Sequence, residues 1–120
     1  MFRPPFAVAA LSAAILAVSA VAAEAHARLV RSDPAADAVV AAPRTISLTF
    51  SDRVAPAFSG FDLVNAGGDR IAVRTQVSED GKTVSGAPAR ALAPGAYTIN
   101  WRIAASDGHR MTGSVAFTVR

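Results

Sequence analysis

The most constraining feature of this 120-residue chain is the strict alternation of apolar and polar side chains in three of its segments. Residues 45–50, 97–103 and 114–119 each place an aliphatic or aromatic side chain at every second position. Because successive side chains of a strand point to opposite faces, this period of two indicates strands with one face in a core. No segment after residue 25 shows a sustained helical period. The sequence therefore predicts an all-β protein.

Weaker strand candidates fill the intervals, and turn-rich pieces such as Gly67-Gly68-Asp69 separate them. These candidates are residues 27–31, 60–64, 71–76 and 83–86. About seven short strands at this spacing predict a Greek-key β-sandwich of two antiparallel sheets, with a small closed barrel as the alternative. Four large aromatic side chains are expected to supply most of the core: Phe50, Tyr97, Trp101 and Phe117.

Residues 1–25 are of a different kind. They carry Arg3, then an apolar run from Phe6 to Ala23, and end on Ala23-Glu24-Ala25. This three-part pattern is typical of a secretory signal peptide that is cut after Ala25. An uncleaved membrane anchor is the alternative, since about 18 apolar residues could just span a bilayer. The dominance of alanine favours cleavage, which would leave a single domain of residues 26–120.

Composition excludes several classes of function. The chain has no cysteine, so disulfides, thiolate metal ligands and a cysteine nucleophile are excluded. Its formal net charge is +3, but the arginines are spread singly along the chain and give no support for nucleic acid binding. A domain of this size buries roughly two-thirds of its unfolded surface, enough for one core and too little for a multidomain enzyme.

Both histidines of the chain stand where they could bind a metal ion. Cleavage after Ala25 would give His26 a free α-amine beside its imidazole, and these two nitrogens form a chelating pair. His109 follows Asp107 and Gly108 between two strand candidates, and in extended backbone Asp107 and His109 would share one face. Two plainer interpretations remain open: an exposed terminus at His26, and a hairpin turn with an exposed His109.

Together these residues offer three nitrogens and one carboxylate oxygen, a donor set that suits Cu(II) when it lies near one plane. Zinc would prefer a tetrahedral site, and Cu(I) would prefer sulfur ligands. After residue 25 the only sulfur belongs to Met111, which the pattern places against the core at the start of the last strand. We expect one Cu(II) ion per chain and no ligand role for Met111.

Several short motifs occur in a fixed order along residues 26–120: His26-Ala27-Arg28-Leu29, Ser32-Asp33-Pro34-Ala35, Ala42-Pro43, Leu48-Thr49-Phe50-Ser51, Leu92-Ala93-Pro94-Gly95-Ala96-Tyr97, Trp101-Arg102 and Ser106-Asp107-Gly108-His109. With these motifs the chain resembles the CopC family of periplasmic copper-binding proteins. The resemblance covers essentially the whole predicted mature chain. It implies an immunoglobulin-like β-sandwich that binds Cu(II) through the amine and imidazole of His26, Asp107 and His109. It also implies that Asp52 lies close to the site as a supporting or weak axial group.

Two segments depart from the family's pattern. Residues 64–70 lack the methionines and the extra histidine that give some relatives a separate Cu(I) site, so a single Cu(II) site is expected. Arg110 stands where proline is common, which would loosen the loop without removing a ligand.

The predicted function is that of a periplasmic Cu(II)-binding protein in copper resistance or homeostasis. It would sequester copper or deliver it to a CopD-like inner-membrane partner, and it is expected to be a monomer without enzymatic activity. One alternative is a copper-dependent oxidative enzyme, because an amine with two imidazoles resembles the copper site of oxidative polysaccharide-cleaving enzymes. The other is a metal-free β-sandwich that binds proteins.

Overall fold

The structure is a computed structural model that describes residues 27–120. The predicted signal peptide and His26 lie outside the described residues. Within residues 27–120, no helix is long and apolar enough to cross a membrane. This part of the chain contains nine strands and one short 3₁₀-helix, in the order β1 (Leu29–Asp33), β2 (Val39–Val40), β3 (Ile46–Phe50), η1 (Pro56–Phe58), β4 (Gly60–Asn65), β5 (Arg70–Ile71), β6 (Val73–Val77), β7 (Thr83–Pro88), β8 (Gly95–Ala104) and β9 (Arg110–Val119).

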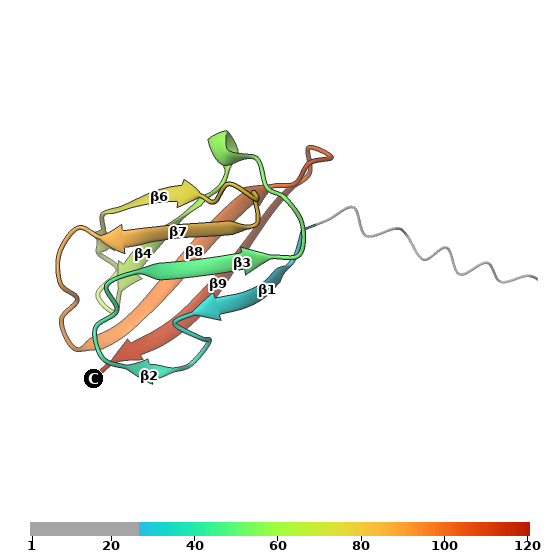
Figure 1. Cartoon of the computed structure of the whole chain (residues 1–120). Coiled ribbons are helices and arrows are strands. Elements are labelled where there is room, and N and C mark those ends of the chain that lie inside the picture. The colour runs from blue at the N-terminus through green and yellow to red at the C-terminus, as the bar shows by residue number, and fades with distance from the viewer. Residues whose placement is uncertain (1–26) are drawn as a thin grey trace, which may run out of the picture.

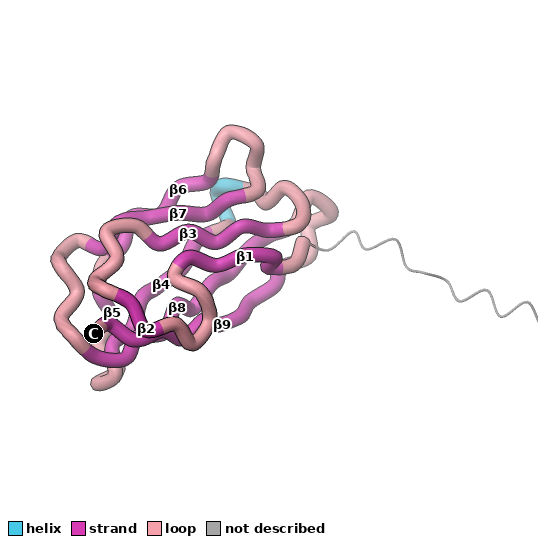
Figure 2. Tube along the Cα trace, turned by 60° about the horizontal axis from the view of Figure 1, so that its bottom comes forward, coloured by secondary structure: helices cyan, strands magenta, loops and turns pink. Residues whose placement is uncertain are grey.

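The strands form two sheets that pack face to face, as Figure 1 and Figure 2 show from two directions. One sheet has the order β1-β3-β7-β6 and the other has the order β2-β9-β8-β4-β5. Strand β2 pairs with β9 in parallel, whereas the other pairs are antiparallel. Because β3 pairs with β7 and β4 with β8, the chain crosses between the sheets in a Greek-key manner. The predicted sandwich is confirmed, and the closed-barrel alternative is wrong.

The aromatic side chains expected in the core are buried between the sheets. Phe50 and Phe117 are 1% and 2% exposed. The rings of Tyr97 and Phe117 stack with 5.5 Å between their centroids, and Phe50 meets Trp101 edge to face at 5.2 Å. The hydroxyl group of Tyr97 donates a hydrogen bond to the carbonyl of Ala93 at 2.6 Å. Burial of each large aromatic contributes about 2–3 kcal/mol before chain entropy is counted.

A β-bulge at Val30 determines which side chains of β1 reach the core. Leu29 pairs with Phe50 and Arg31 pairs with Thr49, so Val30 is the extra residue of this strand. Val30 is 54% exposed, whereas Leu29 packs against the core and Ala27 is fully buried in it. The bulge therefore allows the first described residues to pack into the core at one end of the sandwich.

Candidate metal centre

Asp107 and His109 lie at the tip of the hairpin that joins β8 to β9. The chain turns there through Gly108, whose φ of 88° lies in the left-handed region that favours glycine. The amide of Gly108 donates to the carbonyl of Ala105 at 2.9 Å, and the amide of Ala105 donates to the carbonyl of His109 at 2.8 Å. Residues 106–108 thus form a turn. The backbone through Asp107 and His109 is therefore not extended, because the positive φ of Gly108 bends the chain.

The turn nevertheless brings the two side chains together. Asp107 Oδ1 accepts a hydrogen bond from the amide of His109 at 2.9 Å, and Asp107 Oδ2 lies 2.8 Å from His109 Nδ1. The side chain of His109 is 66% exposed and that of Asp107 is 26% exposed. A carboxylate that accepts a hydrogen bond from Nδ1 of an imidazole fixes the ring's orientation, and Nε2 is then the nitrogen that a metal ion would bind. The plainer interpretation of a hairpin turn with an exposed histidine is confirmed, and it is compatible with metal binding.

The first described residues lie at the same end of the sandwich as this hairpin tip (Figure 1 and Figure 2). The amide of Arg28 donates to Ser51 Oγ at 2.9 Å, and the amide of Ser51 donates back to the carbonyl of Arg28 at 2.8 Å. The segment after Ser51 then reaches the hairpin, because Val54 forms a β-bridge with Ala105. Two segments far apart in the sequence, residues 27–28 and 105–109, are therefore both tied to residues 51–54.

Asp52 belongs to this connecting segment. Its carboxylate is half-buried and accepts a hydrogen bond from the amide of Arg53 at 2.7 Å. Among the residues that the structure describes, no three His, Asp or Glu side chains form a group able to hold a metal ion. The structure thus brings Asp107 and His109 together, while the expected role of Asp52 stays a prediction. His26, the remaining predicted ligand, lies outside the described residues.

No role was expected for Phe58 or for the side chain of Arg110, which meet beside this end of the hairpin. The guanidinium carbon of Arg110 lies 5.1 Å from the centroid of the Phe58 ring. Phe58 belongs to the single turn of η1, which is too short to produce a periodic signal in the sequence. No pattern in the chain predicted this contact.

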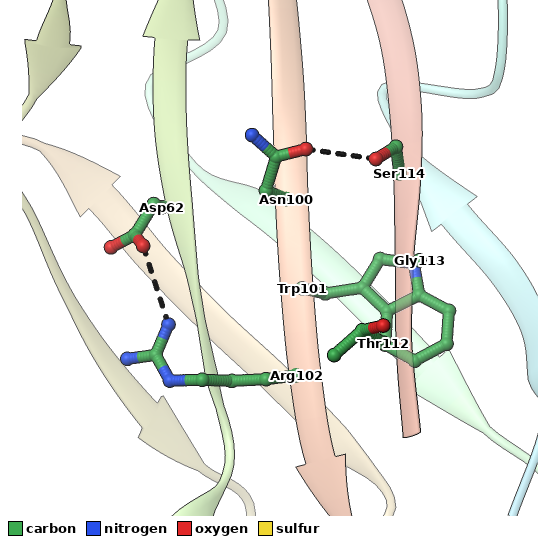
Figure 3. Close-up of a pocket in the computed structure, with 7 residues that line it drawn as sticks. All are labelled: Asp62, Asn100, Trp101, Arg102, Thr112, Gly113 and Ser114. Carbon is green, nitrogen blue, oxygen red and sulfur yellow. Dashed lines mark hydrogen bonds and ion pairs between the residues drawn. The ribbon is translucent and has the colours of Figure 1, made fainter.

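A separate hollow of about 330 Å³ lies on the β4-β8-β9 sheet (Figure 3). Four of the polar side chains that line it interact in pairs. Asp62 forms an ion pair with Arg102 at 3.5 Å, and the hydroxyl group of Ser114 donates to the side-chain oxygen of Asn100 at 2.8 Å. This hollow contains one carboxylate and no histidine, so its donor set does not match the predicted metal centre.

Comparisons with known proteins agree with the fold and identify the family. The family model for the CopC domain matches residues 29–120. A copper resistance protein C from Pseudomonas syringae pv. tomato is 42% identical over 117 residues, which cover 92% of this chain and 92% of the relative. Copper resistance protein C from Xanthomonas campestris pv. juglandis is 34% identical over 80% of this chain and 81% of its own length.

A solved structure of a copper resistance protein has a similar fold. The crystal structure of PcoC, described as a methionine-rich copper resistance protein from Escherichia coli, superposes with a TM-score of 0.73 at 35% identity. The match covers 79% of this chain and 99% of PcoC. The family model spans the described strands from β1 to β9, and the relatives match over most of their own length. The chain therefore belongs to the CopC family.

Proposed function

We propose that this chain is a periplasmic protein that binds one Cu(II) ion through the amine and imidazole of His26, the carboxylate of Asp107 and the imidazole of His109. The observation that carries the proposal is the Asp107–His109 pair at the end of the sandwich where the described chain begins. The relatives that bear the name copper resistance protein support copper as the metal.

The geometry of the described residues supports this donor set. The distance of 2.8 Å between Asp107 Oδ2 and His109 Nδ1 matches two neighbouring corners of a square plane with metal–ligand bonds of about 2.0 Å. His26 is joined to Ala27 by a peptide bond, which sets a Cα–Cα distance of about 3.8 Å. Ala27 in turn lies in the core next to Arg28, whose backbone is tied to Ser51. Three nitrogens and one carboxylate oxygen favour Cu(II) over Cu(I).

The proposal requires removal of residues 1–25, because only cleavage directly before His26 creates the α-amine ligand. The same cleavage would place the protein in the periplasm. There it would sequester copper or deliver it to a CopD-like membrane partner, and so contribute to copper resistance.

An enzymatic role is less well supported. With Asp107 in the fourth in-plane position, the proposed site has no open in-plane position for a substrate oxygen. The relatives from Pseudomonas syringae and Xanthomonas campestris are named for copper resistance and not for a reaction. We therefore infer a copper-binding role. We also propose that the chain acts as a monomer.

The test is a Cu(II) titration of the mature chain, after mass spectrometry has confirmed that it begins at His26. The fluorescence of Trp101, the single tryptophan, reports binding, and electron paramagnetic resonance reports the donor atoms. One equivalent of Cu(II) with nitrogen donors is expected. The matched control carries one additional glycine before His26, which converts the amine into an amide and should weaken binding steeply. Equal affinity of the two proteins would contradict the proposed role of the amine.

A further inference from the structure

The residue that follows His109 is held by an aromatic side chain from another part of the fold. Arg110 is the first residue of β9, and its guanidinium lies over the ring of Phe58 at 5.1 Å. Phe58 ends η1 and remains 57% exposed. A guanidinium at this distance from an aromatic face is attracted by the ring's quadrupole. The Phe58–Arg110 contact thus joins η1 to the hairpin that carries Asp107 and His109.

The surroundings of Ala104 show where this contact lies on the sheet. Buried and exposed positions alternate along β8, and the alternation from exposed Arg102 places Ala104 on the outer face. Ala104 is nevertheless only 5% exposed, and it is not part of the core cluster. It is the register partner of Arg110, its carbonyl accepts a hydrogen bond from the amide of Ala55 at 2.8 Å, and its amide donates to Ser59 Oγ at 3.2 Å. The η1 segment therefore covers the outer face of the sheet beside Arg110.

Both ends of the loop that carries Asp107 and His109 are connected to η1 or to the residues just before it. On one side, Ala105 forms a β-bridge with Val54, shortly before η1. On the other side, Arg110 is held by Phe58. The loop between them is closed by the hydrogen bond from the amide of Ala105 to the carbonyl of His109 at 2.8 Å. Phe58 thus contacts the side chain of the residue that immediately follows His109.

We propose that Phe58 is a positioning residue for copper binding: its ring holds the guanidinium of Arg110 and thereby fixes the orientation of His109. This inference rests on the proposed function, because it requires His109 to be a ligand. A donor that is already oriented loses less conformational freedom when the metal binds, and so binds more tightly.

The first test compares Phe58→Ala, Arg110→Ala and the double variant in the mature chain, by Cu(II) titration against a competing chelator. Loss of an exposed cation–π contact should weaken Cu(II) binding about two- to fivefold in each single variant. The double variant should lose little more than either single one, because both substitutions remove the same contact. Phe58→Tyr keeps the aromatic face, so it should retain the parent's affinity and paramagnetic resonance spectrum.

The control is Val39→Ala, which removes another exposed apolar side chain, 58% exposed, on β2 beside the C-terminal end of β9. It should leave the affinity unchanged. A second readout uses the metal-free protein: Phe58→Ala should speed amide hydrogen exchange at Ala105 and Gly108, while its unfolding temperature stays close to that of Val39→Ala. A purely structural role of Phe58 would lower the unfolding temperature and leave the affinity of the folded protein unchanged.

Two results separate this inference from the proposed function. If the parent binds Cu(II) as expected and Phe58→Ala binds it equally well, the positioning role is overturned and the proposed function stands. Additive losses in the double variant would also overturn the positioning role, because they would show that Phe58 and Arg110 act independently. If the parent binds no copper, both proposals are overturned.

Discussion

At the scale of single residues, the contact between Asp107 and His109 allows two arrangements around the metal. In one, the carboxylate accepts a hydrogen bond from Nδ1 and orients the ring, so that Nε2 binds the ion. In the other, both groups are ligands at neighbouring corners of a plane. The distance of 2.8 Å between Oδ2 and Nδ1 fits either arrangement, and an amide in place of the carboxylate separates them.

Asp107→Asn keeps an oxygen that can accept the hydrogen bond from Nδ1 but removes the anionic donor. We expect Cu(II) binding to weaken by about 10–100-fold if Asp107 only supports His109, which is the range for loss of such a group. The loss should be larger if Asp107 is itself a ligand. The paramagnetic resonance spectrum decides the role of Asp107. A changed spectrum is expected, since the proposed site loses its one negative ligand. An unchanged spectrum with lower affinity would show that Asp107 only orients His109.

His109→Ala should separate metal binding from stability. The side chain is 66% exposed at a hairpin tip, so its removal should change the free energy of unfolding of the metal-free protein by no more than about 0.5 kcal/mol. Cu(II) affinity should fall by at least about tenfold, because one of three nitrogen donors is lost. Thermal unfolding and titration measure the two quantities. A large drop in the unfolding temperature without metal would instead assign His109 a structural role.

At the scale of the elements, the turn between β6 and β7 contains a carboxylate that stabilises it. Asp80 Oδ1 accepts hydrogen bonds from the hydroxyl group of Ser78 at 2.5 Å and from the amide of Lys82 at 3.0 Å. These two hydrogen bonds, with Ser78 the stronger cause, lower the pKa of Asp80 below its usual value. Its charged form therefore stabilises the fold above the pKa of the unfolded chain, and this contribution is lost as the pH falls through the folded-state pKa.

Asp80→Asn should therefore unfold at a lower urea concentration than the parent at pH 7. The difference should shrink as the pH falls below the usual range for a carboxyl group, because the parent's Asp80 then becomes neutral as well. Glu79→Gln in the same turn is the matched control, and it should behave like the parent. A difference between Asp80→Asn and the parent that is constant from pH 7 to strongly acid solution would show that charge is not the cause.

How far the elements could be predicted depends on how strongly each segment alternates. The three segments with strict alternation lie in β3, β8 and β9, as expected. The strands β2 and β5 have two residues each, too few for a pattern. Strand β9 begins at Arg110, close to the expected start at Met111, although strict alternation is visible only from residue 114. The reason is Gly113, where a Cβ atom would collide with the indole of Trp101, so this core-facing position carries no apolar side chain (Figure 3).

The candidate site could also be predicted only in part from the sequence. Residue types and spacing were sufficient to single out Asp107 and His109, because few residue types bind metal ions and both lie between two strongly patterned strands. The turn geometry was not accessible, since it depends on the φ of Gly108. Nor was the Phe58–Arg110 contact, because it depends on the way η1 folds over the outer face of β8.

At the scale of the whole molecule, the proposed ligands come from both sheets. His26 directly precedes the segment that leads into β1, the edge strand of the first sheet, whereas Asp107 and His109 connect β8 and β9 in the second sheet. A metal ion bound by all three would therefore join the start of the first sheet to a hairpin of the second. Because unfolding would break this link, copper should bind the folded protein in preference to the unfolded chain. It should therefore raise the free energy of unfolding, by an amount that depends on the ratio of the free copper concentration to the dissociation constant.

We therefore expect Cu(II) to raise the unfolding temperature and to slow hydrogen exchange most strongly where the chain begins. Free copper at 100 times its dissociation constant should add about 2.7 kcal/mol to the free energy of unfolding. The amides of Arg28 and Ser51, which form the hydrogen bonds at the start of β1, should gain the most protection among the sheet amides. The chain with an additional glycine before His26 should lose both effects at the same copper concentration, because its amine can no longer bind. If copper instead protects the hairpin amides of Ala105 and Gly108 while Arg28 and Ser51 exchange as in the metal-free protein, then the ion is held by Asp107 and His109 without the N-terminus, and the two sheets are not joined through it.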